Sequence, residues 1–226
     1  MWPLLETAGR RFLSLFHPPE RIKPMNILHL DSSILGAYSA SRDLSAAIVD
    51  RLVVLNPGAV VTYHDLDAQS PLHLSSAHMA VFQGAPVEDA DLGSDLGKGG
   101  AYIEELFAAD IIVIGAPMYN FTISTQLKSW IDRVVIAGKT FQYGANGPES
   151  LLPSGKKVFL ASTRGGAYSE GSPAASLEHH ESYLLGVLGF IGLTDVTIVR
   201  AEGLAMGDDA KAAEIAKAKG QIAAFA

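Results

Sequence analysis

Residues 26–55 read NILHLDSSILGAYSASRDLSAAIVDRLVVL, and this stretch contains the alternation that decides the fold. The short apolar run from Asn26 to Asp31 predicts a strand, and a serine-rich loop follows it. Ser41 to Leu55 then predicts a helix, because its apolar residues recur every three or four positions along one stripe. The residues of that stripe are Leu44, Ile48 and Leu52.

The same alternation of strand and helix continues to the C-terminus. Further strands are expected at Val60–His64, Ile111–Pro117, Lys157–Thr163 and Val196–Ala201. Further helices are expected at Gly100–Ala109, Ser124–Ala137, Glu178–Ile191 and Asp209–Phe225. Right-handed crossovers then favour an α/β fold: a doubly wound five-stranded parallel sheet with helices on both faces and ligands at the carboxyl ends of the strands. Residues 65 to 99 are the least periodic stretch, and Pro86 to Gly100 predicts a mobile surface loop.

Composition and charge limit the classes of function. The chain has 226 residues, of which 48% are hydrophobic, and this length favours one domain. Its net charge of −7 argues against nucleic acid and membrane partners, and no apolar run approaches the roughly 20 residues of a membrane helix. Because the chain has no cysteine, any redox chemistry must reside in a cofactor. We expect residues 1–24 to be a flexible N-terminal extension rather than a signal peptide, residues 25–226 to be the domain, and the location to be cytoplasmic.

The loop after the first strand is a candidate phosphate cradle. It holds four serines within ten residues, Ser32 to Ser41, and leads into a helix. Hydroxyls and the free N–H groups of a helix N-terminus both donate to phosphate oxygens. The plainer alternative is that Ser39 or Ser41 only caps the helix. The loop lacks the glycine patterns of dinucleotide and triphosphate sites, so a mononucleotide suits it better.

Two further strands end in unusual loops. The third strand leads into an aromatic turn, Met118 to Phe121, in which the Asn120 amide suits the polar edge of a flavin ring and an aromatic side chain suits its face. The alternative is an aromatic core plug, with Ser124 or Thr125 capping the next helix. The fourth strand ends in Thr163 to Gly166, whose paired glycines either admit a ligand close to the backbone or make a plain turn.

With these loops in view, the sequence resembles the FMN-dependent NADH-azoreductase family, also known as NADH:quinone reductases, which have a flavodoxin-like fold. The resemblance covers Met25 to the C-terminus and includes further segments in matching order, at residues 127–130, 140–143, 146–149 and 188–192. Thr163 replaces the family's usual serine, and the first 24 residues have no counterpart. The residues that resemble the family's FMN contacts are Ser33, Ser39, Ala40, Ser41, Met118, Tyr119, Asn120, Phe121, Thr163, Arg164, Gly165 and Gly166.

The resemblance implies a function and an assembly. It implies non-covalent FMN, NADH or NADPH as electron donor, two-electron reduction of quinones and cleavage of azo compounds to amines, in a ping-pong order. It also implies a homodimer with one FMN per subunit at the interface. The hydride goes to the flavin, so no side chain is assigned as certainly catalytic. The candidate pocket residues are Asn120 and the apolar wall of Phe141 and Tyr143.

Two other functions stay open from the sequence. One is a flavodoxin-like FMN electron carrier without an organic substrate. The other is a phosphodiesterase-type hydrolase, although no G-x-S-x-G elbow is present. His179-His180-Glu181 lacks metal-ligand spacing and is expected on a solvated or interfacial helix face. His73 and His78 are given no role, and no metal site is expected.

Overall fold

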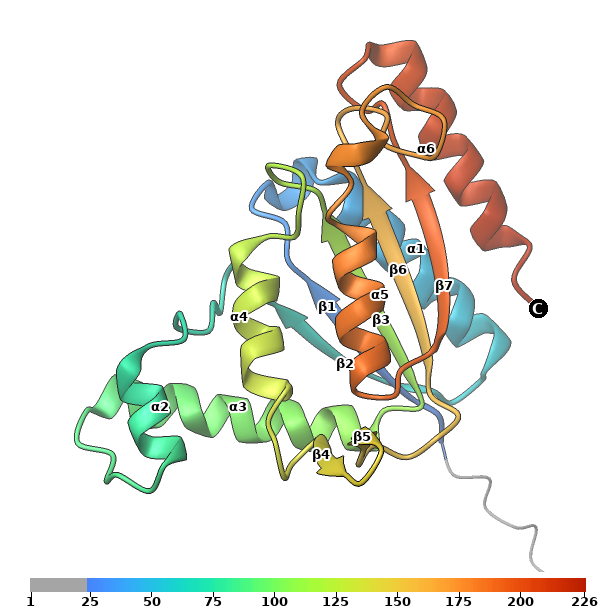
Figure 1. Cartoon of the computed structure of the whole chain (residues 1–226). Coiled ribbons are helices and arrows are strands. Elements are labelled where there is room, and N and C mark those ends of the chain that lie inside the picture. Colours follow the sequence, from blue (N-terminus) through green and yellow to red (C-terminus); the bar gives the residue numbers. More distant parts are fainter. Residues whose placement is uncertain (1–23) are drawn as a thin grey trace, which may run out of the picture.

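The computed structural model describes residues 24–226, and a five-stranded sheet lies at its centre (Figure 1). All four strand pairings are parallel, in the spatial order β2-β1-β3-β6-β7. The sequence predicted each strand to within one residue at either end. The strands are β1 (Asn26–Asp31), β2 (Val60–Asp65), β3 (Ile111–Pro117), β6 (Lys157–Thr163) and β7 (Asp195–Ala201).

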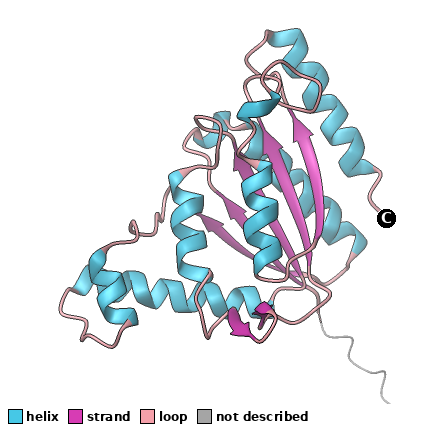
Figure 2. Ribbon diagram, in the orientation of Figure 1, coloured by secondary structure: helices cyan, strands magenta, loops and turns pink. Residues whose placement is uncertain are grey.

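Helices cover both faces of the sheet (Figures 1 and 2). One face is covered by α1 (Ala40–Leu55) and α6 (Asp208–Ala223), and the other by α3 (Ala90–Ala108), α4 (Thr125–Val134) and α5 (Glu181–Phe190). The short helical elements are α2 (Ser76–Phe82) and two 3-10 turns, Gly36–Tyr38 and Ala175–Leu177. The predicted doubly wound α/β class is therefore confirmed.

Side-chain alternation along the strands produces two cores, one on each face of the sheet. Ile27, Val113 and Phe159 pack with residues of α1 and α6. Leu28 and Ile112 belong to the other core, which includes residues of α3, α4 and α5. The central strand β3 is buried along its whole length, as the apolar run in its sequence predicted.

The expectation of a mobile loop over Pro86 to Gly100 is wrong, because α3 begins at Ala90. Asp89 caps the helix by accepting the N–H of Leu92 at 2.7 Å. One of the glycines that suggested a loop, Gly99, permits close packing instead. A Cβ at Gly99 would lie 3.1 Å from Cδ of Arg133 on α4, so glycine lets the two helices approach.

Phe141 and Tyr143, the predicted apolar wall, lie in a small hairpin of β4 (Phe141–Gly144) and β5 (Gly147–Ser150). Within residues 24–226, no helix is both long enough and apolar enough to cross a membrane. The predicted N-terminal extension lies outside the described residues except for Pro24, and its flexibility stays a prediction.

Candidate cofactor-binding site

The loops after β1, β3 and β6 lie at the same edge of the sheet, at the carboxyl ends of the strands (Figure 1). Pairing in register brings them level, with Asp31 opposite Gly115 and Pro117 opposite Thr163. The N–H of Met118 donates to the carbonyl of Thr163 at 2.8 Å. The three candidate loops are therefore direct neighbours, in the position where open α/β sheets bind ligands.

In the first loop, serine hydroxyls gather at the start of α1. Ser39 caps the helix, its Oγ accepting the N–H of Arg42 at 3.3 Å, and lies 3.0 Å from Oγ of Ser41. The N–H groups of Ala40 and Ser41 lie in the first turn, where a helix provides no internal acceptor. Ser39 therefore caps the helix, and the cap leaves donors at the helix N-terminus for an anion.

Ser33 links the first loop to the second. Its side chain is fully buried, and its Oγ lies 3.0 Å from the hydroxyl of Tyr119. The same Tyr119 hydroxyl accepts the N–H of Ile34 at 3.2 Å. Tyr119 is thus half-buried and fixed by the first loop.

The second loop is a tight turn in an unusual backbone conformation. Asn120 and Phe121 have φ values of 46° and 72°, in the left-handed region that costs a non-glycine residue about 1–2 kcal/mol. Reciprocal backbone bonds between Tyr119 and Thr122, at 2.9 and 3.1 Å, close the turn. Phe121 is 41% exposed and Asn120 is exposed, so the turn is not an aromatic core plug. Ser124 caps α4, as the alternative proposed.

The third loop rests on a buried ionic cluster that the sequence analysis did not find. The guanidinium of Arg164 is 1% exposed and its Nη2 lies 2.5 Å from Oε1 of Glu181. Burial raises the pKa of Glu181, but hydrogen bonds from Arg200 and Ser162 outweigh this effect and lower it. Because the side chain of Arg164 is directed into this cluster, a ligand contact at this position falls on its backbone.

Glu202 extends this cluster towards the glycines. Its Oε2 lies 3.7 Å from Nη1 of Arg164 and accepts the N–H groups of Tyr168 and Ser169 at 3.0 and 3.2 Å. The carbonyls of Gly165 and Gly166 accept N–H groups of Ala205 and Gly203, both at 2.9 Å. The carbonyls of the two glycines are thus already hydrogen-bonded. Their N–H groups have no acceptor among the described residues.

The histidines singled out in the sequence differ in burial: His78 and His180 are buried, whereas His73 and His179 are exposed. His180 was expected on a solvated or interfacial face, but its side chain is fully buried beside Arg164. Burial and the charge of Arg164 lower its pKa to about 4, so it is neutral at pH 7. His78 is 2% exposed and contacts Asp95 and Arg133, while His73 and His179 are exposed. No group of three or more potential ligands in residues 24–226 is placed to hold a metal ion.

The two residues expected as an aromatic wall do not lie at this edge of their own chain. The β4–β5 hairpin is at the amino ends of the strands (Figure 1), where Ser150 donates to the carbonyl of Ile191 just beyond α5, at 2.6 Å. Phe141 is 6% exposed and packs on Phe190, with ring centroids 4.7 Å apart. Tyr143 is 75% exposed.

The donors that remain free form two sets suited to FMN. The first set, at the start of α1, combines serine hydroxyls with helix N–H groups and suits a phosphate. The second set consists of the N–H groups of Asn120, Phe121, Gly165 and Gly166, none of which has an acceptor among residues 24–226. Such donors suit the polar edge of a flavin ring. The residues present therefore fit this cofactor.

The sheet order and the three ligand-side loops define a flavodoxin-like α/β protein. A family model described as flavodoxin-like fold matches residues 25–226. The chain is 55% identical over 186 residues to FMN-dependent NADH:quinone oxidoreductase 2 of Bradyrhizobium diazoefficiens, covering 82% of this chain and 91% of that protein. It is 53% identical over 202 residues to the FMN-dependent NADH:quinone oxidoreductase of Xanthomonas campestris, covering 89% and 99%.

A solved structure supports the same assignment. The azoreductase of Bacillus anthracis has a TM-score of 0.76 and 27% sequence identity to this chain, and the match covers 89% of this chain and 100% of that one. The chain therefore belongs to the FMN-dependent NADH:quinone oxidoreductase family within the flavodoxin-like fold. The resemblance found in the sequence is confirmed.

Proposed function

We propose that the protein is an FMN-dependent NADH:quinone oxidoreductase that also cleaves aromatic azo compounds. The observation that carries the proposal is the presence of two sets of free donors at one sheet edge, one for a phosphate and one for a ring edge. Its relatives at 53–55% identity are named for FMN, NADH and quinone. Its structural relative at 27% identity is named an azoreductase.

The roles of the chain's residues follow from the loops. Bound FMN would supply the two-electron chemistry between NADH and the acceptor. Ser39, Ala40 and Ser41 hold the phosphate, while the Asn120 amide and the Gly165 and Gly166 N–H groups donate to the polar edge of the ring. The buried hydroxyl of Ser33 keeps Tyr119 and its turn in place. The remaining proposed contacts are the backbone and side chains of Met118 and Phe121 and the backbone of Thr163 and Arg164.

The same arrangement argues against the other two functions. An electron carrier needs no open face for an organic substrate, whereas the exposed Asn120 and Phe121 border this edge and the named relatives act on quinones. A hydrolase needs a base beside its hydroxyl nucleophile. Among the described residues, the hydroxyls of Ser33, Ser39 and Ser41 bond to other hydroxyls and to backbone N–H groups, with no histidine partner.

We further propose that the protein is a homodimer in the cytoplasm, with an exposed Tyr143 supplying the acceptor wall to the partner's site. A lone chain cannot use this residue there, because its hairpin is at the opposite edge of the sheet. Phe141 is buried against Phe190 and supports Tyr143 from the core, so its proposed role is to hold the hairpin in place.

The cofactor is tested by an absorbance spectrum of the purified protein, followed by chromatography of the ligand released by heat. We expect FMN in the supernatant and NADH oxidation only when a quinone or azo acceptor is present. A colourless protein that gains no flavin on incubation with FMN contradicts the proposal. Parallel double-reciprocal plots are expected for the two substrates, since both stack on one ring face and take turns there.

A further inference from the structure

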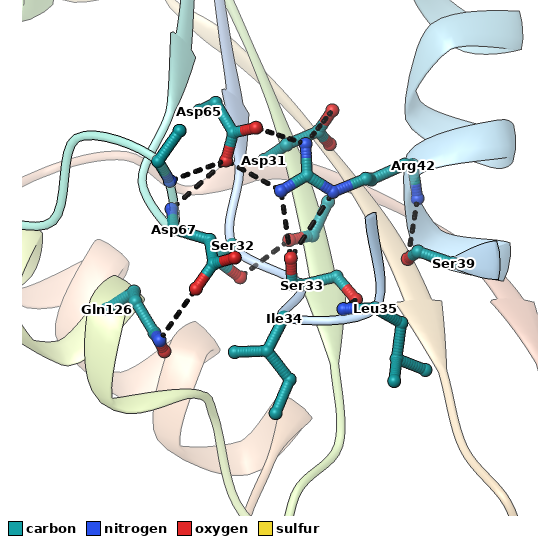
Figure 3. Close-up of polar contacts among 12 residues, drawn as sticks. Asp31, Ser32, Ser33, Ile34, Leu35, Ser39, Arg42, Asp65, Asp67 and Gln126 are labelled. Atoms are coloured by element: carbon teal, nitrogen blue, oxygen red, sulfur yellow. Dashed lines mark hydrogen bonds and ion pairs between the residues drawn. The ribbon is translucent and has the colours of Figure 1, made fainter. Parts of the chain in front are cut away.

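Arg42 lies in the first turn of α1, and its side chain runs back to the loop that follows β1 (Figure 3). Its Nη2 and Nε donate to the carbonyl of Ser33 at 2.8 and 3.3 Å. Its Nη1 and Nη2 also donate to the two carboxylate oxygens of Asp65, at 2.7 and 2.6 Å. One guanidinium therefore joins the proposed phosphate loop to the end of β2.

Asp65 is itself anchored on its other side. Its Oδ1 accepts the N–H groups of Asp67 and Ala68 at 3.0 and 3.3 Å. The side chain of Asp67 in turn accepts from Nε2 of Gln126 at 3.2 Å, in the first turn of α4 (Figure 3). The network thus extends from the phosphate loop through Arg42 to the helix that follows the ring-binding turn.

The positive charge of Arg42 also offsets nearby negative charge at the proposed phosphate loop. Its Nη1 lies 3.9 Å from Asp31 and it also donates to the hydroxyl of Tyr63, so one cation neighbours the two carboxylates Asp31 and Asp65. The hydrogen bond and charge of Asp65 raise the pKa of Arg42 further, so Arg42 is always a cation. Without it, two carboxylates would remain beside the loop proposed to hold a dianionic phosphate, and they would repel that ligand.

An ordinary ion pair would explain the Asp65 contact but not the two donors directed at Ser33. The carbonyl of Ser33 belongs to a loop, and the same residue bonds Tyr119 through its hydroxyl. Ser33 is consequently the point at which the phosphate loop and the ring-binding turn meet. Holding its carbonyl fixes both.

We propose that Arg42, anchored by Asp65, is a positioning residue that fixes the Ser33–Ser39 loop for the cofactor phosphate and offsets the negative charge of Asp31 and Asp65. The proposal rests on the proposed function, since it needs FMN at this edge. It predicts a contribution to phosphate binding from a side chain that need not touch the phosphate.

The test compares FMN with riboflavin, which lacks the phosphate. Dissociation constants are measured on the apo form of the full chain by fluorescence quenching. In Arg42→Gln we expect the FMN dissociation constant to rise at least about tenfold, while that of riboflavin changes by less than about twofold. Arg51→Gln is the matched control, because Arg51 is also on α1 but bonds the carbonyl of Phe225, away from the loop. It should change neither constant.

Arg42→Lys keeps the charge but cannot donate to Ser33 and to both oxygens of Asp65 in the same geometry, so it should restore part of the preference for FMN over riboflavin. The inference is overturned if Arg42→Gln loses the same factor of affinity for FMN and for riboflavin, or if it loses no more FMN affinity than the Arg51→Gln control. If circular dichroism shows that Arg42→Gln does not fold, Arg42→Lys is tested in its place. A preference of Arg42→Lys for FMN over riboflavin equal to that of the wild type would then overturn the inference. A wild-type chain that binds neither ligand refutes the proposed function itself, and this inference with it.

Discussion

At the scale of single residues, Ser39 combines a structural role with a proposed functional one. It caps α1 in the structure and is proposed to hold the phosphate with Ser41. Loss of an N-cap costs about 0.5–2 kcal/mol of stability and affects all ligands alike. Loss of a hydrogen bond to a charged group, worth about 1.5–3 kcal/mol, weakens only a ligand that carries the phosphate.

Replacing Ser39 and Ser41 together by alanine is therefore expected to lower FMN affinity more than tenfold and to leave riboflavin affinity nearly unchanged. Equilibrium dialysis with both ligands measures the difference. Asp89→Ala serves as the control, because it removes the N-cap of α3 without altering the phosphate loop. If the double variant binds FMN as tightly as the Asp89→Ala control does, the two serines do not bind the phosphate.

His180 gives a residue-scale prediction about pH. Its pKa is lowered to about 4 in the folded protein, against about 6.5 in the unfolded chain. Between these values the unfolded state binds a proton that the folded state does not, so the free energy of unfolding falls as pH falls from about 6.5 to about 4. The slope from this one group is at most about 1.4 kcal/mol per pH unit.

Urea unfolding at several pH values between 5 and 7 measures that slope, above the range in which most carboxylates titrate. His180→Gln should flatten it, since glutamine carries no proton to bind. His179→Gln is the matched control. The side chain of His179, next to His180 in the sequence, is exposed, so removing it should leave the slope unchanged. If the free energy of unfolding changes with pH by the same amount in both variants, His180 is not the group responsible for the slope.

At the scale of elements, the strands were predictable and parts of the helical layer were not. β3 and β6 are buried on both faces, so their apolar runs stand out in the sequence. The C-terminal half of α3 was predicted as a helix, but its N-terminal half, from Ala90, was predicted as a loop because of its glycines and acids. The close approach to Arg133 explains the glycine at position 99, and the sequence alone does not show this approach. The ion pair between Arg42 and Asp65 joins residues 23 positions apart, and local sequence patterns do not predict such a pair.

A buried carboxylate on α3 connects that helix to α2 and α4. Oδ2 of Asp95, on α3, accepts from Nε of Arg133 at 2.5 Å and lies 3.1 Å from Nε2 of His78, and Oδ1 accepts the N–H of Leu72 at 2.7 Å. Asp95→Ala leaves the buried Arg133 without a carboxylate partner, and breaking a buried ion pair in this way costs about 3–5 kcal/mol in comparable cases. Hydrogen exchange over residues 72–82 should become faster, while the affinity of the remote loops for FMN stays the same.

Asp91→Ala, on an exposed position of the same helix, is the control for Asp95→Ala and should change neither quantity much. An Asp95→Ala variant with unchanged exchange over residues 72–82 would mean that apolar contacts alone hold α2. A loss of FMN affinity would instead mean that the α2–α3 unit contributes to the cofactor site.

At the scale of the whole molecule, parallel topology explains why the three binding loops could be inferred together. Strand ends of a parallel sheet meet at one edge, so separate local patterns in the sequence converge without knowledge of distances. The position of the β4–β5 hairpin could not be inferred in this way. It follows α4, which runs from the carboxyl edge back to the amino edge, and the sequence gives no register for a segment outside the main sheet.

The position of the hairpin determines which site Tyr143 can reach. Because Tyr143 is remote from the carboxyl edge of its own chain, it affects turnover only if a second subunit brings it to the site. We expect a dimer by sedimentation velocity. In that dimer, Tyr143→Ala should raise the apparent Michaelis constants of both donor and acceptor about three- to tenfold, since the two substrates share one wall, with FMN content unchanged.

Tyr143→Phe retains the ring and is the matched control, expected near wild type. Mixing Tyr143→Ala subunits with subunits that carry the Ser39 and Ser41 substitutions provides the decisive comparison, because each site in a mixed dimer combines loops from one chain with a hairpin from the other. Half of the sites in such a dimer would have intact loops and an intact Tyr143, and activity should recover above the average of the two parent variants. Additive activity without recovery, or a monomeric protein with full turnover, would rule out a hairpin donated by the partner.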